Sequence, residues 1–120
     1  MNHRLNELKI WHKANDIAVM VYKVTRDFPS EEKFNLTSQM RRSAVSISSN
    51  IAEGAGRNGD KEFINFLGIS NGSSYELLAQ IEIASRIKLL TPQTSEDLIN
   101  NLIEIQKMNS GLQKMLKSKL

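Results

Sequence analysis

The sequence of 120 residues contains no cysteine, two prolines, two histidines and no long apolar run. Without cysteine the chain forms no disulfide and offers no thiolate ligand to a metal ion. Nowhere do eighteen apolar residues follow one another, and the N-terminal segment is polar. The sequence therefore predicts neither a transmembrane helix nor a signal peptide, and we expect a cytoplasmic protein without membrane contact.

Catalytic and cofactor-binding motifs are also missing. His3 and His12 are the only histidines, and neither forms the HExxH pair of zinc proteases or the Glu-x-x-His pair of di-iron bundles. The glycine-rich run EGAGRNGD lacks the Lys-Ser/Thr of a phosphate-binding loop. A metal-independent nuclease with Glu53 as base and Arg42 and Arg57 on a phosphate is an alternative that nothing in the spacing requires. We expect no enzymatic activity and no cofactor.

Short breaks divide the rest of the chain into four amphipathic segments. An apolar content of 40% over 120 residues suits one domain, residues 1–120, that buries its own core. Because the connections are short, consecutive helices are antiparallel neighbours. The sequence predicts an all-α fold, an antiparallel up-down-up-down four-helix bundle, with helices at about 8–27, 31–55, 60–90 and 95–117.

Residues of particular conformational preference mark the predicted helix ends. The predicted N-terminal caps of the second, third and fourth helices are Ser30, Asp60 and, after the break at Pro92, Thr94 or Ser95. Gly56 or Gly59 is expected to take the left-handed conformation that closes the second helix. Gly68 and Gly72 interrupt the third helix, and we expect them to lie close against the second, because glycine inside a helix otherwise destabilises it.

The segment 38–57, SQMRRSAVSISSNIAEGAGR, is the most informative part of the chain. At about 100° of rotation per residue, its apolar positions fall on one side of a helix and its polar positions on the other. Arg42 and Arg57 lie on the polar side, whereas Arg41 points about 100° away from Arg42. This helix therefore has one face for packing and one for binding.

This segment also carries a resemblance that covers nearly the whole chain. RRSAVSISSNIAEGAGR, preceded by LKIWHKA and FPSEEKFNLTSQ and followed by FINFLGISNGSSYELLAQIEIA, resembles the four-helix-bundle family named for the intervening sequence of bacterial 23S ribosomal RNA. That family is similar in fold to the accessory variability determinant of diversity-generating retroelements, a homopentameric bundle that binds nucleic acid and a reverse transcriptase. The resemblance implies a homopentamer, with structured RNA or DNA and a reverse-transcriptase-like or other protein as partners.

The third and fourth predicted helices carry apolar residues on more faces than one bundle covers, which indicates self-association. The alternative is that these residues border the core of a monomer. The candidate interface residues are Arg41, Ile64, Tyr75, Ile99 and Ile103.

Basic residues are distributed unevenly along the chain. The net charge is +3, and residues 1–57 hold nine basic and six acidic side chains. A basic surface repeated in an oligomer attracts phosphates. The candidate nucleic-acid-binding residues are Arg42, Arg57, Lys61, Lys9 and Lys13. In the alternative interpretation Arg42 pairs with Glu53, the lysines are only solvated, and the oligomer is a protein-protein adaptor that binds no nucleic acid.

Overall fold

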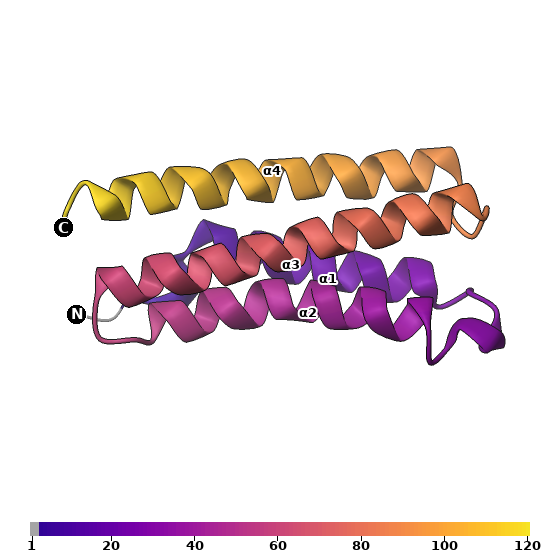
Figure 1. Cartoon of the computed structure of the whole chain (residues 1–120), viewed down its shortest axis with the longest axis horizontal. Coiled ribbons are helices and arrows are strands. Elements are labelled where there is room, and N and C mark those ends of the chain that lie inside the picture. The colour runs from indigo at the N-terminus through magenta and orange to yellow at the C-terminus, as the bar shows by residue number, and fades with distance from the viewer. Residues whose placement is uncertain (1–2) are drawn as a thin grey trace.

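The computed structural model describes residues 3–120, and this part of the chain is all-helical without a strand. The four long helices are α1 (Lys9–Thr25), α2 (Leu36–Ala55), α3 (Asp60–Arg86) and α4 (Pro92–Lys117), and short 3-10 turns lie at Leu5–Glu7 and Ser30–Glu32. In Figure 1 the helices lie along the long axis of a body measuring 46 × 22 × 20 Å, and the colour gradient follows the chain back and forth along that axis. The predicted all-α, four-helix fold is confirmed.

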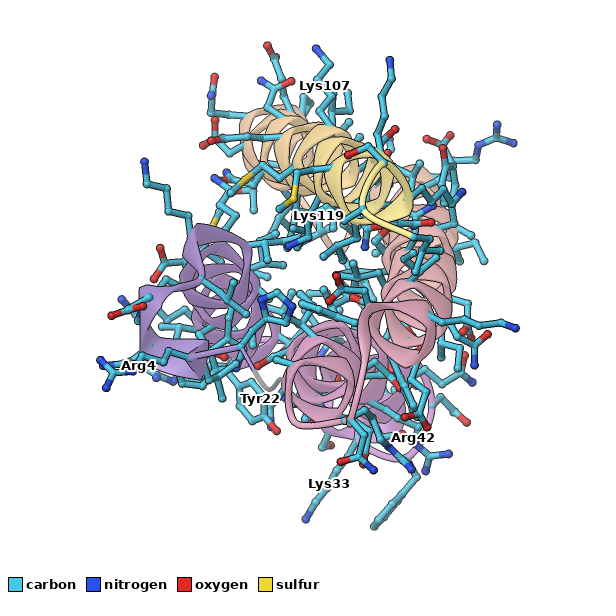
Figure 2. The ribbon with its side chains drawn as sticks, turned by 90° about the vertical axis from the view of Figure 1, so that its left-hand side faces the viewer. Arg4, Tyr22, Lys33, Arg42, Lys107 and Lys119 are labelled. Carbon is cyan, nitrogen blue, oxygen red and sulfur yellow. The ribbon has the colours of Figure 1, made fainter. Side chains whose placement is uncertain are left out.

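Each helix contacts two neighbours around a shared core, α1 with α2, α2 with α3, α3 with α4 and α4 with α1, as the end-on view in Figure 2 shows. The core is continuous from one end of the bundle to the other. Its largest fully buried side chains are Ile17, Met40, Ile47, Ile51, Phe63, Leu67, Leu77, Ile81, Leu98, Leu102, Ile105 and Leu116. The apolar side predicted for segment 38–57 is the buried side of α2.

The contact between α2 and α3 is the most extensive in the bundle, because small residues let the two backbones approach. Ser70 Oγ donates to the Ile47 carbonyl at 2.8 Å, and the hydroxyls of Ser46 and Ser73 are 2.8 Å apart. A Cβ atom on Gly54 would lie 2.7 Å from the Cβ of Phe66. Gly54 is therefore the glycine that this contact requires.

The prediction that Gly68 and Gly72 pack against α2 is wrong. Both are exposed on the outer side of α3, and a Cβ atom built on either would meet nothing within 4 Å. The residues that contact α2 lie on the opposite side of α3, where Ser70 and Ser73 are buried.

The second helix begins later than predicted. Ser30 opens a 3-10 turn instead of capping a helix from residue 31, and α2 starts at Leu36 after Asn35. The Glu32 carboxylate accepts a hydrogen bond from the Leu36 amide at 3.4 Å. Leu36 and Thr37 are the first residues of α2 to be buried. Residues 33–35 therefore form an exposed connection between the turn and the helix.

Four other predictions about helix ends differ from the structure. Gly59, not Asp60, is the N-cap of α3, and Thr91 caps α4 by accepting a hydrogen bond from the Thr94 amide at 3.1 Å. Pro92 starts α4, because the first helical position needs no amide donor. Neither Gly56 nor Gly59 is left-handed, with φ values of −83° and −164°. The first helix ends at Thr25, before the predicted Asp27.

The left-handed residue lies instead at the end of α3. Lys88 has φ 64°, the one positive φ angle of a non-glycine residue in the described chain. The Leu89 amide donates to the Ala84 carbonyl at 2.9 Å and the Lys88 amide to the Ser85 carbonyl at 3.0 Å. This pair of bonds is a Schellman motif, in which glycine normally occupies the position of Lys88.

We expect Lys88→Gly to raise the free energy of unfolding by about 0.5–1 kcal/mol, because glycine removes the left-handed strain but loosens the unfolded chain. Urea denaturation at a fixed protein concentration measures this change. Lys88→Ala is the matched control, since alanine retains the Cβ atom that causes the strain. Equal urea midpoints for the two variants would contradict a strained left-handed conformation at Lys88.

Candidate nucleic-acid interface

A basic hollow of about 460 Å³ lies between α1, α2 and the connection that joins them. The residues that line it, and that define the basic hollow, are Tyr22, Lys33, Phe34, Thr37, Ser38, Arg41, Arg42 and Val45. A second hollow of about 320 Å³ adjoins it, shares Lys33, Thr37 and Arg41, and adds Arg26. No aspartate or glutamate lines either hollow.

Arg41 and Arg42 have different surroundings, as the helical rotation between them predicts. The Nε of Arg41 donates to the Thr25 hydroxyl at 2.9 Å, and its guanidinium lies 4.5 Å from the centroid of the Tyr22 ring. Arg41 therefore joins α2 to α1 within one chain. Its predicted role at an oligomer interface is untested by these contacts.

The guanidinium of Arg42 has no hydrogen bond or ion pair with any residue among 3–120. The predicted alternative partner, Glu53, instead accepts from Arg57 at 3.1 Å. In Figure 2 Arg42 and Lys33 project from the same side of the bundle, whereas Lys107 projects from the opposite side. The cations of Arg42 and Lys33 are therefore available to an anion that approaches α2.

Arg57 and Lys61 lie at the other end of α2, at the turn into α3. Arg57 is bonded to Glu53 and lies 4.0 Å from the Glu62 carboxylate, and its guanidinium is 4.9 Å from the Phe66 ring. Lys61 is exposed in the first turn of α3. The carboxylates around this turn oppose an anion, whereas no carboxylate lines the basic hollow.

Asp60 adds a further negative charge to this turn. Its Oδ1 is 3.0 Å from the Nε2 of His3, and its Oδ2 is 3.7 Å from the ammonium of Lys119. The hydrogen bond with His3 is the main cause that holds the pKa of Asp60 below its usual range; burial opposes it, and the charge of Lys119 adds to the lowering. The carboxylate thus stays ionised and ties both ends of the described chain to the start of α3.

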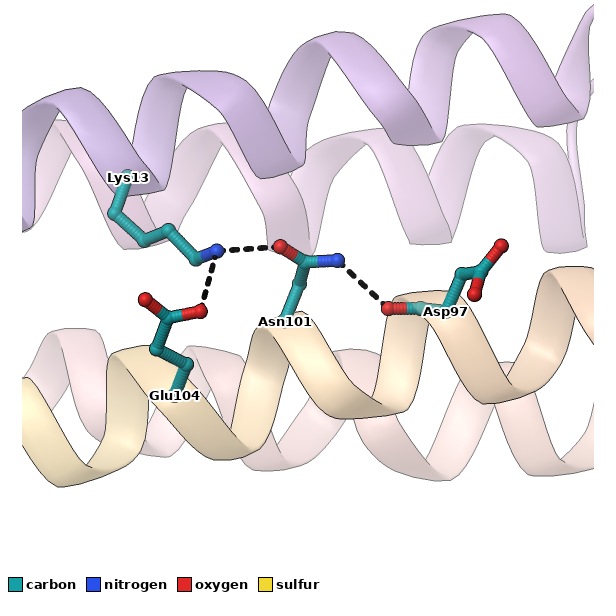
Figure 3. Close-up of polar contacts among 4 residues, drawn as sticks. All are labelled: Lys13, Asp97, Asn101 and Glu104. Atoms are coloured by element: carbon teal, nitrogen blue, oxygen red, sulfur yellow. Dashed lines mark hydrogen bonds and ion pairs between the residues drawn. The ribbon is translucent and has the colours of Figure 1, made fainter.

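Lys9 and Lys13 differ in availability although both lie on α1. Lys13 bonds to Asn101 and to Glu104, the latter at 2.9 Å, and its side chain is only 17% exposed (Figure 3). Asn101 is in turn held by the Asp97 carbonyl at 2.7 Å. Lys13 therefore connects α1 to α4, whereas Lys9 is exposed at the start of α1. The five predicted binding residues do not form one cluster.

The predicted interface residues of α3 and α4 divide into two kinds. Ile64 and Ile99 are half-buried and pack against the core of their own bundle. Tyr75 is 55% and Ile103 41% exposed. The hydrogen bond from Gln106 to the neighbouring Ser74 places Tyr75 and Ile103 at the same level on adjoining helices. They form an exposed apolar surface on the outer side of α3 and α4.

Sequence reasoning missed Lys33 and Phe34 as site residues because it placed them inside a helix. One signal was available. On the predicted helix 31–55, at 100° per residue, Phe34 falls on the side opposite the core residues Leu36 and Met40. An aromatic residue on the polar side, next to a lysine, indicates a surface with a use other than core packing.

Two further properties of the described chain bear on the kind of site. Residues 3–120 contain no group of three or more histidine or acidic side chains placed to hold a metal ion. None of the helices that these residues form is both long and apolar enough to cross a membrane.

Comparison with known proteins identifies relatives over most of the length. A solved structure from Bacteroides thetaiotaomicron, described as a protein of unknown function from the S23 ribosomal protein family, superposes with a TM-score of 0.81. It is 27% identical, and the match covers 88% of this chain and 95% of that chain. No curated protein matches. The family model of the 23S rRNA-intervening sequence protein matches residues 6–111. The chain therefore belongs to the 23S rRNA-intervening sequence protein family.

Proposed function

We propose that this protein is a non-enzymatic homo-oligomer that binds nucleic acid through backbone phosphates. The observation that carries the proposal is the basic hollow, where Lys33, Arg41 and Arg42 line one surface without a carboxylate. Guanidinium groups suit phosphate oxygens because their planar donors match the spacing of two oxygens. The family's name, which refers to an intervening sequence of 23S rRNA, agrees with an RNA ligand.

The proposed assembly is a cytoplasmic homopentamer of up-down-up-down bundles, with a fold like that of the accessory variability determinant of diversity-generating retroelements. Its partners are structured RNA or DNA and a reverse-transcriptase-like or other protein. The exposed surface around Tyr75 and Ile103 supports self-association. A net charge of +3 on each chain is multiplied in a symmetric oligomer, which strengthens attraction to a polyanion.

Binding is expected to weaken steeply as the salt concentration rises. Fluorescence anisotropy with labelled structured RNA and duplex DNA gives the dependence of the logarithm of affinity on the logarithm of salt. We expect Arg42→Ala to reduce the slope by roughly 0.9 for each phosphate of duplex DNA that the variant no longer neutralises. Lys107→Ala is the matched control, because Lys107 lies on the opposite side of the bundle (Figure 2). This substitution should leave the slope unchanged.

A second candidate function is a protein-protein adaptor that binds no nucleic acid. The exposed apolar side chains of Tyr75 and Ile103 favour it, because such a surface also suits another protein. If the wild-type protein retains neither structured RNA, single strands nor duplex DNA at low salt, nucleic-acid binding is excluded and the adaptor function takes its place.

A further inference from the structure

Two exposed aromatic side chains flank the basic hollow. Phe34 is 84% exposed and Tyr22 is 43% exposed, and both line the hollow together with Val45. Phe34 lies in the connection before α2 and is absent from the core. A phenylalanine exposed to this degree contributes little to folding. The ammonium of Lys33 lies over one face of the ring, which leaves the other face for a ligand.

Tyr22 is held in place by a contact with one face of its ring. The guanidinium of Arg41 lies 4.5 Å from the ring centroid, and Arg41 is itself bonded to the hydroxyl of Thr25. That hydroxyl donates to the Val21 carbonyl at 2.7 Å, within α1. The ring is therefore positioned by two helices before any ligand binds, which reduces the entropy that binding costs.

Two of the cations that line the hollow lie over these rings, Lys33 over Phe34 and Arg41 over Tyr22. The ammonium of Lys33 is 5.5 Å from the centroid of the Phe34 ring, and Arg42 has no ion pair among residues 3–120. Thr37 and Ser38, which carry hydroxyl groups, also line the hollow. The hollow thus presents a flat aromatic face, positive charge and hydroxyl groups within one surface.

This combination matches an unpaired nucleotide. A base stacks on an aromatic side chain through its face, while the phosphate beside it needs a cation. In a duplex the base faces are covered by neighbouring base pairs, so a duplex offers the hollow only phosphates. A volume of about 460 Å³ falls within the usual size of a small-molecule site.

We infer that the basic hollow is a subsite for an unpaired nucleotide of single-stranded nucleic acid, with the base stacked on Phe34 and the phosphate bound by Lys33 and Arg42. The inference rests on the proposed nucleic-acid function and names its substrate class. Single strands of RNA and DNA both present the base face and the phosphate that the hollow is proposed to contact, so both are expected to bind.

The test compares the wild-type protein with Phe34→Ala, using labelled oligouridine RNA, oligothymidine DNA and a DNA duplex. Loss of one stacked base is expected to weaken binding of either single strand by about 5- to 150-fold. Affinity for the duplex should stay unchanged. Circular dichroism and sedimentation confirm that the variant retains its fold and oligomeric mass, as expected for an exposed residue.

Two further variants separate stacking from simple apolar contact. Phe34→Trp should retain single-strand binding, because it keeps an aromatic face, whereas Phe34→Leu should lose it. Binding retained by the leucine variant would overturn the inference. A lower oligomeric mass for Phe34→Ala would also overturn it, since a second copy of the chain would then cover the ring.

The outcomes also distinguish this inference from the proposed function. If the wild-type protein binds single strands and duplex equally and Phe34→Ala alters neither, the subsite is excluded while nucleic-acid binding stands. If the wild-type protein binds neither these three probes nor structured RNA, the proposed function itself fails, and the subsite with it.

Discussion

Gly54→Ala is expected to destabilise the protein by about 1–3 kcal/mol, because it places a methyl group where α2 and α3 are in contact. The new Cβ would lie 2.7 Å from the Cβ of Phe66 and 2.9 Å from a ring carbon of Phe63. Phe63 is fully buried, and the Cβ of Phe66 is attached directly to the backbone of α3. Neither atom has room to move without separating the helices. Chemical denaturation at one protein concentration measures the change.

Gly111→Ala is the matched control for this prediction. Gly111 is exposed within α4, and a Cβ atom there would meet nothing within 4 Å. The same substitution should therefore stabilise the protein by about 0.5–1 kcal/mol, through the lower conformational freedom of alanine in the unfolded chain. Changes of the same sign in both variants would contradict the close approach of the helices at Gly54.

Tyr75→Asp combined with Ile103→Asp is expected to dissociate the proposed homo-oligomer. Both side chains are exposed on the outer side of the bundle, so a charge there costs little in the single chain. In an interface the same charges would be buried without partners, which is strongly unfavourable. Sedimentation equilibrium at micromolar concentration should show the mass of the single chain for the double variant and a multiple of it for the wild type.

Met115→Asp is the control for the double variant. Met115 is 47% exposed on α4, a degree of exposure similar to that of Ile103, but it lies outside the predicted interface residues. This substitution should leave the mass unchanged. We prefer Tyr75 and Ile103 to Ile64 and Ile99, because the latter pack against their own core and a charge there would weaken the fold as well. A double variant that stays fully assembled would place the interface elsewhere.

The buried side of each helix was predictable because it depends on periodicity. The apolar residues that repeat on one side of segment 38–57 are all buried in α2, namely Met40, Ala44, Ile47, Ile51 and Ala55. The rotation between Arg41 and Arg42 was equally predictable, and it separates a residue bonded to α1 from one without a partner among the described residues. These properties depend on about 100° of rotation per residue and need no knowledge of the neighbours.

Contacts between distant residues were not predictable from local pattern. Nothing near Lys13 in the sequence indicates that Glu104 bonds to it, and nothing near Gly54 indicates that Phe66 lies against it. The late start of α2 also depends on tertiary structure, because it brings Leu36 to the core. For this reason Lys33 and Phe34, which the delayed start leaves in an exposed connection, were missed as site residues.

Sedimentation velocity of the protein mixed with fluorescent single-stranded RNA at low salt reports assembly and nucleic-acid binding together. We expect the RNA to sediment with a protein species whose mass is a multiple of 13.6 kDa, fivefold for a pentamer. Lys33→Ala combined with Arg42→Ala should release the RNA and leave the protein mass unchanged. RNA that sediments alone beside a wild-type protein of single-chain mass would contradict both the proposed assembly and the proposed binding.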